Sequence, residues 1–320
     1  MNTTDILSEP LGGLSRNEWF RRLERLCEDE GSYEPIGDRH TSVFIDRSPS
    51  VLLVTFEEAE EVRLVNNNGQ PIAFPLAIAR DWSNLCILAH GETWYRDEAL
   101  YRYFDRLVDD GLFEDFDHVV FYGAEMGAYG AAAYSVTAPG ASVFAIQPVA
   151  SLTGSVAAWD PRFRDKRHLD FTSRYGFAPR MIEGASKAFI CYDPYETLDA
   201  MHASMFHDHS VVHLRCPHLG GQIESDFDHM GLMGRLLAMI GEDRLTRESF
   251  YQLYRQRREH AFFLRRLLDK LEDDDRPYLA AMLSRNAARR LHRRRFHESY
   301  QAARAKLAER GIPWDDRASR

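Results

Sequence analysis

The chain has 320 residues, enough for one large α/β domain with an extension or for roughly two domains of about 150 residues. Hydrophobic residues make up 44% and the net charge is −9, which excludes a disordered chain and argues against a general binder of nucleic acid or anionic membrane. The first ten residues lack the pattern of a signal peptide, and no run of about 18 apolar residues occurs. We therefore expect a cytoplasmic protein with no membrane span.

The first part of the chain is expected to combine helices with short strands. Ser15 and Glu18 have the spacing of a capping box, which predicts a helix through residues 19–26. Residues 42–46 and 51–56 are rich in β-branched and aromatic side chains and are separated by a turn, which predicts two paired strands. The next predicted elements are a strand at 85–89 and a helix at 98–110.

From residue 118 onward, predicted strands and helices alternate regularly. The strands are expected at 118–122, 142–146, 187–192 and 211–214, and the helices at 125–136, 195–206 and 223–240. Continuous apolar strands separated by helices are typical of a mostly parallel sheet with helices on both faces. An insertion at about 150–185 is expected over the carboxyl ends of the strands, where such sheets bind ligands. Its charged loop, 162–167, favours pairing within the loop, with an anionic substrate as the alternative.

The rest of the chain is expected to be helical. Apolar spacing predicts helices around residues 250–254, 262–271, 278–291 and 300–307. The expected organisation is a helical lead-in at 1–39, an α/β domain at 40–245 and a helical extension at 246–320. The extension carries a basic run, Arg285, Arg289, Arg290, Arg293, Arg294 and Arg295. A solvated face paired with acids is the plainer interpretation, and an anionic partner is the alternative.

The most specific motif is the segment Gly123-Ala124-Glu125-Met126-Gly127. It follows a predicted strand and opens a helix of small residues, which is the setting of the G-x-S-x-G nucleophile elbow. Glycines are needed on both sides of the central residue because strand and helix approach closely at such a turn. Here the central position holds Glu125 and not serine.

On these features the sequence resembles the α/β-hydrolase superfamily over residues 40–245. The resemblance implies a catalytic triad in the chain order nucleophile, acid and base. The matching positions are Glu125, then Asp193 with Asp199 as a second choice, then His218. The resemblance also implies two oxyanion donors, the backbone N–H groups of Met126 and of a residue near Glu57.

Glu125 cannot serve as a serine-type nucleophile. It is one methylene longer than the aspartate that some members of the superfamily use, and a pair with protonated His218 would raise the pKa of that histidine and remove it as a base. We therefore expect a degenerate elbow and a non-catalytic role in binding a small molecule or protein, or as a scaffold. The alternative is an atypical ester or acyl hydrolase that uses His218 and Asp193, with Glu125 as nucleophile or base.

A second resemblance is to bacterial proteins labelled phosphoadenosine phosphosulfate reductase. It rests on several stretches, including residues 94–97, 101–109, 192–194 and 199–203. The label implies a pyrophosphate loop and a catalytic cysteine near the C-terminus. The chain has no such loop, and its last cysteine is Cys216, so its residues argue against that activity.

No cofactor and no metal are expected from the sequence. A dinucleotide loop in residues 123–130 would need a glycine where Glu125 stands. His202, His207 and His209 cluster with Asp208, but they lack the spacing of a known metal motif. The four cysteines form no C-x-x-C pair, which argues against a zinc ribbon.

Overall fold

The computed structural model describes residues 11–28 and 31–314, and the chain divides into two compact units. Unit 1 spans Met1–Phe250 and unit 2 spans Tyr251–Arg320. The expectation that residues 1–10 carry no signal peptide lies outside the described residues. The domain boundaries proposed at residues 39 and 245 stay predictions.

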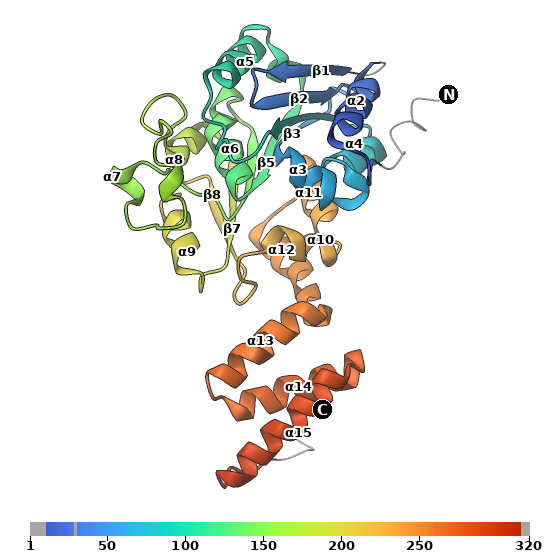
Figure 1. The fold of residues 1–320 in the computed structure, drawn as a ribbon, viewed down its shortest axis with the longest axis vertical. Helices are drawn as coiled ribbons and strands as arrows, with labels where there is room; N and C mark the ends of the chain where they lie inside the picture. Colours follow the sequence, from blue (N-terminus) through green and yellow to red (C-terminus); the bar gives the residue numbers. More distant parts are fainter. Residues whose placement is uncertain (1–10, 29–30, 315–320) are drawn as a thin grey trace. The chain divides into compact units, whose positions relative to one another are not determined.

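Unit 1 is built on a mostly parallel sheet, shown in Figure 1, that has eight strands among the described residues. The strands are β1 (Gly31–Ile36), β2 (His40–Ile45), β3 (Val51–Glu58), β4 (Ser83–Ala89), β5 (His118–Ala124), β6 (Ser142–Ile146), β7 (Lys187–Tyr192) and β8 (Val211–Arg215). Their order across the sheet is β1-β2-β4-β3-β5-β6-β7-β8. The β1–β2 and β2–β4 pairs are antiparallel and the remaining pairs are parallel.

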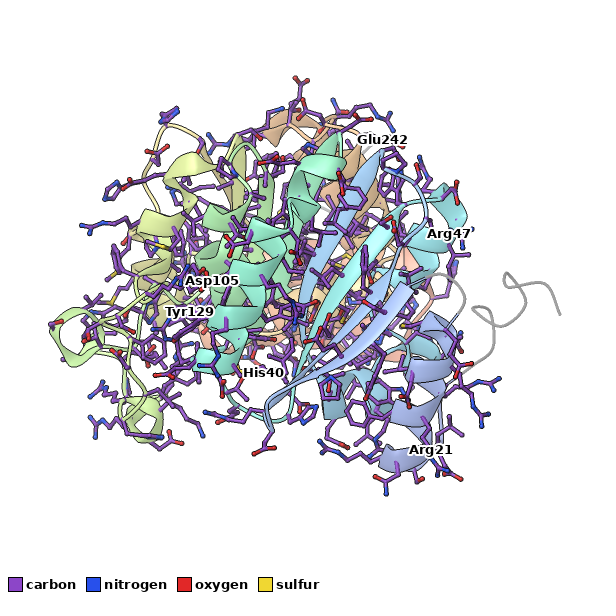
Figure 2. All side chains as sticks on the ribbon, turned by 90° about the horizontal axis from the view of Figure 1, so that it is seen from above. Arg21, His40, Arg47, Asp105, Tyr129 and Glu242 are labelled. Carbon is purple, nitrogen blue, oxygen red and sulfur yellow. The ribbon has the colours of Figure 1, made fainter. Side chains whose placement is uncertain are left out.

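Helices cover both faces of this sheet (Figures 1 and 2). The helices before α12 are α2 (Arg16–Cys27), α3 (Ala59–Leu64), α4 (Phe74–Arg80), α5 (Glu98–Asp109), α6 (Met126–Tyr134), α7 (Gly154–Ala157), α8 (Ala178–Met181), α9 (Thr197–Ser204), α10 (Ile223–His229) and α11 (Met233–Gly241). Alternate residues of β4 join different cores. Leu85 and Ile87 pack in the core that also holds residues of α5 and α6, and Cys86 and Leu88 pack in the core that holds residues of α2 and α4. This alternation is the period of two expected of a strand buried on both faces.

The predicted fold class is confirmed: the sheet is mostly parallel with helices on both faces, and a helical C-terminal part is present. The strands predicted from residue 118 onward match β5 to β8, and the capping box at Ser15 opens α2. The prediction that the strands at 42–46 and 51–56 pair with each other was wrong. Asn84 of β4 pairs with Ile45 of β2 on one side and with Leu53 of β3 on the other, so β4 separates the two.

Three further elements differ from the prediction. Residues 31–36, assigned to a helical lead-in, form β1 at the edge of the sheet. The short helices α3 and α4 between β3 and β4 were not predicted. The single helix expected at 223–240 is two helices, because Gly231 between them adopts φ 65°, which a continuing helix cannot accommodate.

The insertion at about 150–185 contains α7, α8 and short 3-10 turns, and no strand among its residues. Contacts with α5, α6 and the loop before α5 hold it to unit 1. Arg96 donates a hydrogen bond to the backbone oxygen of Arg174 at 2.6 Å, and Arg174 pairs with Asp105 of α5 at 2.6 Å. The hydroxyl of Tyr129 in α6 donates to the backbone oxygen of Tyr175 at 2.8 Å (Figure 2). These contacts hold the insertion against α5, α6 and the loop before α5.

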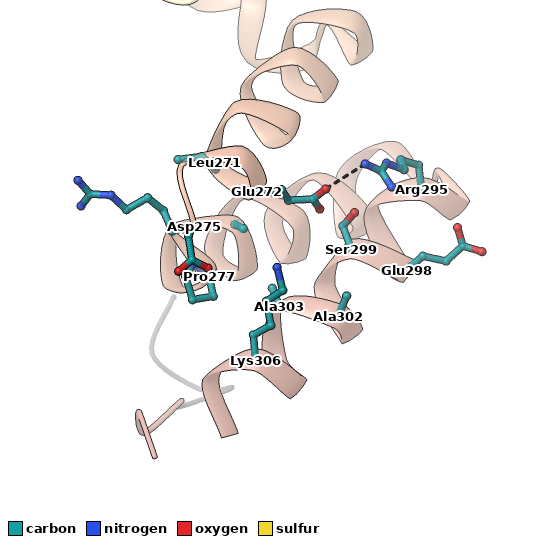
Figure 3. A pocket seen from close by; sticks show the side chains of 12 residues that line it. Leu271, Glu272, Asp275, Pro277, Arg295, Glu298, Ser299, Ala302, Ala303 and Lys306 are labelled. Atoms are coloured by element: carbon teal, nitrogen blue, oxygen red, sulfur yellow. Dashed lines mark hydrogen bonds and ion pairs between the residues drawn. The ribbon is translucent and has the colours of Figure 1, made fainter. Parts of the chain in front are cut away.

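The C-terminal helices are α12 (Arg247–Tyr254), α13 (Ala261–Asp273), α14 (Pro277–Leu291) and α15 (Arg294–Glu309). In unit 2, α13, α14 and α15 enclose a shallow pocket of about 250 Å³ (Figure 3). Helices long and apolar enough to cross a membrane do not occur in the part of the chain that the structure describes.

Four residues of the basic run make contacts within unit 2. The Arg285 guanidinium lies 4.9 Å from the Trp314 ring centre, Arg290 pairs with Glu259, Arg294 with Glu298 at 2.6 Å, and Arg295 with Asp269 at 2.9 Å and Glu272 at 3.1 Å (Figure 3). This pairing is what the plainer interpretation expects. An anionic partner for Arg285, Arg289, Arg290, Arg293, Arg294 and Arg295 stays a prediction.

Candidate active site

Glu125 stands on a sharp turn between β5 and α6. Its backbone adopts φ 49° and ψ −112°, a region in which a non-glycine residue is strained. A Cβ on Gly123 would lie 2.2 Å from the backbone of Gly127, and one on Gly127 would lie 2.2 Å from the backbone oxygen of Phe56. The glycines are therefore required by the close approach of strand and helix, which is the reason the sequence suggested an elbow.

The elbow borders a cavity of about 550 Å³ at the carboxyl ends of β3, β5 and β6. Its wall consists of Phe56, Glu57, Glu58, Glu61, Val62, Asn66, Gly91, Glu92, Trp94, Ala124, Glu125, Met126, Gly127, Gln147, Val149, Arg162, Phe163, Glu196, Asp199, Gly221 and Glu224. Eight of these described residues carry carboxyl groups and one carries a guanidinium. The cavity is therefore strongly acidic, with an apolar part that includes three aromatic rings.

The Glu125 side chain faces this cavity without a hydrogen bond or ion pair to any described residue. Although it is exposed to the cavity, the surrounding wall removes enough water to raise its pKa, and the charges of Glu61 and Asp199 raise that pKa further. Burial likewise raises the pKa of Glu61 and raises that of Glu224 to about 8. Near neutral pH the Glu224 carboxyl therefore keeps its proton.

Arg162, the one guanidinium in the described wall, is already paired with acids. It lies 2.6 Å from Asp199 Oδ1 and 2.8 Å from Asp160 Oδ2. Asp199 also accepts a hydrogen bond from Gln147 Nε2 at 2.8 Å. Asp199, the second choice for a triad acid, is therefore held in this network. Pairing within the loop 162–167 was expected, but the two acids that Arg162 meets, Asp160 and Asp199, lie outside that loop.

The positions predicted for the triad acid and base lie outside the cavity wall. Asp193 is buried and accepts the backbone N–H groups of Tyr195 at 2.9 Å and Gly220 at 2.8 Å. The His218 ring stacks on Tyr195 with ring centres 4.2 Å apart, and its buried Nδ1 has no hydrogen-bond partner among the described residues. Within the described chain, no hydrogen bond or ion pair joins Glu125, Asp193 and His218. The direct contacts of a triad are therefore missing.

Both residues proposed to donate from their backbone line the cavity. Met126 is the first residue of α6, and its sulfur accepts the backbone N–H of Trp94 at 3.2 Å. Glu57 is the penultimate residue of β3, and its carboxylate accepts the backbone N–H of Ile72 at 2.9 Å and the hydroxyl of Thr55 at 2.8 Å. Burial raises the pKa of Glu57. The oxyanion role of the two backbones stays a prediction.

Two of the histidines considered as metal ligands, His202 and His209, make other contacts. His202 is buried, with Nε2 3.2 Å from Asp160 and Nδ1 accepting the backbone N–H of Ala150 at 3.2 Å. His209 lies 2.6 Å from Asp208 at the surface. Across residues 11–28 and 31–314, no three His, Cys, Asp or Glu side chains are grouped so that they could share a metal ion.

Sequence reasoning missed Glu61, Glu224, Trp94 and Phe163 as parts of this site. Glu61 could have been suspected, because it follows a predicted strand whose neighbour carries the elbow. Glu224 gives no such signal. It lies in a segment that reads as an ordinary helix, and only the fold brings it to the cavity.

No protein-family model matches the chain, and no curated protein matches it. Among solved structures, the chain is similar to the thermostable carboxylesterase EstE1 from a metagenomic library, with 15% identity and a TM-score of 0.43, over 73% of this chain and 99% of that one. It is also similar to an esterase from Pyrobaculum calidifontis, with 12% identity and a TM-score of 0.44, over 73% and 95% of the two chains.

A third solved structure is the glycosylation-associated protein complex Gap123 from Streptococcus agalactiae. The identity is 16% and the TM-score 0.45, over 67% of this chain and 46% of that one. Likeness at such identities concerns the fold and says nothing of the chemistry. The reductase label receives no support from these comparisons, and Cys216, the last cysteine, is fully buried.

Proposed function

We propose that unit 1 is a non-hydrolytic binding domain on an α/β-hydrolase scaffold, and that the cavity beside the elbow takes a small molecule. The observation that carries this proposal is the state of Glu125. It occupies the nucleophile position on a strained turn and faces a cavity of about 550 Å³, without contact to an acid or a base of the expected triad. A cavity of this size lies in the range of small-molecule sites, roughly 300–1,000 Å³.

The arrangement of the other two positions supports the same view. A triad base must lie within hydrogen-bond reach of its nucleophile and be oriented by the acid. Asp193 instead caps two backbone N–H groups, and His218 stacks on an aromatic ring. Each residue thus has a structural task that explains its presence without catalysis.

A panel of p-nitrophenyl esters of increasing acyl length tests this proposal. We expect wild type to release p-nitrophenol no faster than buffer. Glu125→Ser should also be inactive, because no base lies in contact with the new hydroxyl. Wild-type turnover that disappears in His218→Ala would overturn the proposal.

An atypical ester or acyl hydrolase is the second candidate. Its support is the raised pKa of Glu125, since general acids and bases work best when they titrate near the working pH. This candidate requires wild-type turnover in the same panel, with a loss of about a hundredfold or more in Glu125→Gln.

A further inference from the structure

The charge of the cavity beside Glu125 is not balanced by the protein. Glu61 and Glu125 make no side-chain hydrogen bond or ion pair within the described chain, and Glu224 accepts only the hydroxyl of Tyr122. The guanidinium of Arg162 is shared between Asp160 and Asp199. The wall therefore offers carboxylate acceptors in excess, with no free cation among its described residues to satisfy them.

The rest of the wall suits an apolar body. Phe56, Trp94, Phe163, Val62 and Val149 all line the same cavity, and the Trp94 and Phe163 rings meet edge to face with centres 4.8 Å apart. Apolar and aromatic walls with a few polar groups are what small-molecule sites commonly provide. Such a wall favours an organic ion over a bare, strongly hydrated one.

Trp94 supplies an independent observation at this site. Its side chain is 3% exposed, and its indole N–H has no acceptor among the described residues. A buried N–H without an acceptor is costly, because the group has lost its hydrogen bond to water. The same wall that has surplus acceptors in its glutamates therefore also has a donor that lacks an acceptor.

We infer that the cavity binds an organic ammonium ion, in which a primary amine meets Glu61, Glu125 and Glu224 and an apolar body carrying an oxygen acceptor lies toward Trp94. This inference rests on the proposed binding role and specifies its ligand class. Primary ammonium groups donate three hydrogen bonds and therefore match several carboxylates at once. An anionic ligand would meet repulsion from the same groups.

Binding of three compounds with one shared body tests the charge requirement. Tyramine is the cation, 4-(2-hydroxyethyl)phenol is the neutral analogue and 3-(4-hydroxyphenyl)propanoate is the anion. Calorimetry on the full-length protein should give tyramine an affinity about tenfold or more above that of the neutral analogue, because charge-assisted hydrogen bonds are the stronger ones. The anion should bind weakest.

Variants of the wall test the place of binding. Glu125→Gln and Glu61→Gln should each lower the affinity for tyramine by roughly threefold to tenfold, because each removes one charge-assisted hydrogen bond and keeps the shape of the side chain. Glu24→Gln is the matched control, since Glu24 lies on α2 and does not line the cavity. Trp94→Phe should lower the affinity for tyramine. It should leave the affinity for 2-phenylethylamine unchanged, because that compound lacks the phenol oxygen.

The pH dependence gives a second readout that does not rely on variants. An alkylammonium group stays charged up to about pH 9, because such groups titrate near lysine, at about 10.4. Burial raises the pKa of Glu224 to about 8, so this carboxyl loses its proton as pH rises through that range, and the pKa values of Glu61 and Glu125 are raised in the same direction. Tyramine affinity should therefore increase between pH 5.5 and pH 8.

Equal affinities across the three compounds, tightest binding of the anion, or no tyramine binding at millimolar concentration would each overturn the inference. Unchanged affinity in both Glu125→Gln and Glu61→Gln would also overturn it. Failure of the proposed function is seen separately, as ester turnover in the p-nitrophenyl assay. If the protein hydrolyses esters and still prefers tyramine, the proposed non-hydrolytic function is contradicted and the inferred ligand class stands.

Discussion

The end of β5 and the ends of β7 and β8 belong to one sheet, but they differ in how closely they match the site that the sequence predicted. At β5, Glu125 keeps the strained conformation of an elbow and faces a cavity. After β7 and β8, Asp193 and His218 stand at the expected places in the chain, yet their contacts are with backbone N–H groups and with the Tyr195 ring and not with Glu125. The first region has the backbone conformation of an elbow. The second lacks the side-chain contacts to Glu125 that a triad requires.

The difference follows from what each feature depends on. The turn at Glu125 is fixed by the close approach of Gly123 to Gly127 and of Gly127 to Phe56, so it persists whatever side chain stands between the glycines. A triad depends on three side chains from separate loops that must meet within hydrogen-bond distance. Close packing in the core therefore fixes the backbone of the turn, whereas nothing comparable fixes the three loop side chains within hydrogen-bond distance of one another.

The largest expected effect concerns the acidic cavity and pH. Burial raises the pKa of Glu224 from its ordinary value of 4.5 to about 8 in the folded state. The folded protein then binds this proton more tightly than the unfolded chain, so the contribution to stability is complete below about pH 4.5 and is lost as pH rises through about 8. At about 1.4 kcal/mol per pKa unit, the loss amounts to roughly 5 kcal/mol.

Chemical denaturation from pH 5 to pH 9 measures this loss. Glu224→Gln keeps an oxygen acceptor for Tyr122 and should flatten the fall, whereas the surface control Glu24→Gln should follow wild type. A Glu224→Gln curve parallel to that of wild type would show that this carboxyl is not buried as the structure has it.

The second effect tests the steric basis of the elbow. Gly127→Ala places a methyl group 2.2 Å from the backbone oxygen of Phe56, so strand and helix must separate. We expect a loss of about 3 kcal/mol in the free energy of unfolding, the upper part of the range for overpacked sites. Gly234→Ala in α11 is the control, because no atom lies near its added Cβ, and it should stabilise by up to about 1 kcal/mol. Equal stability of the two variants would contradict a tight elbow.

The elbow and most strands were predictable because their signals are local. Glycine spacing around Glu125 and continuous apolar runs in β5, β6 and β7 leave few alternatives to a parallel sheet with a sharp turn. Pairing was less predictable. The strands at 42–46 and 51–56 look like a hairpin along the chain, and only the position of β4 shows that they are not neighbours.

The order of the site residues along the chain was predictable, but the contacts that their side chains make were not. Chain order placed Asp193 and His218 correctly after their strands, but hydrogen bonds to backbone groups and ring stacking are not visible in a sequence. Glu61 comes to the cavity from α3, a helix that was not predicted, and Glu224 from α10, the first part of the helix predicted at 223–240. Electrostatics of a cavity depends on such distant residues, so its acidity could not be derived from the motif alone.

The third effect concerns Asp193 as the acceptor of two backbone N–H groups, one in its own loop and one in the loop after β8. Asp193→Ala removes the acceptor of the Tyr195 and Gly220 N–H groups and should cost about 2 kcal/mol, since hydrogen bonds to charged groups contribute about 1.5–3 kcal/mol. Asp193→Asn retains one acceptor oxygen and should lose about half as much. Denaturation midpoints of the two variants check this order, and a loss as large in Asn as in Ala would indicate that the charge matters more than the cap.

The smallest effect decides whether the two regions communicate. His218→Ala should cost about 0.5–1 kcal/mol, the value of its stacking on Tyr195. Because no contact joins His218 to Glu125 within the described chain, the costs of His218→Ala and Glu125→Gln should add to within about 0.5 kcal/mol in the double variant. Urea denaturation of the four proteins in this cycle measures the coupling. A coupling above about 1 kcal/mol would mean that elbow and histidine still act together, as in a working hydrolase.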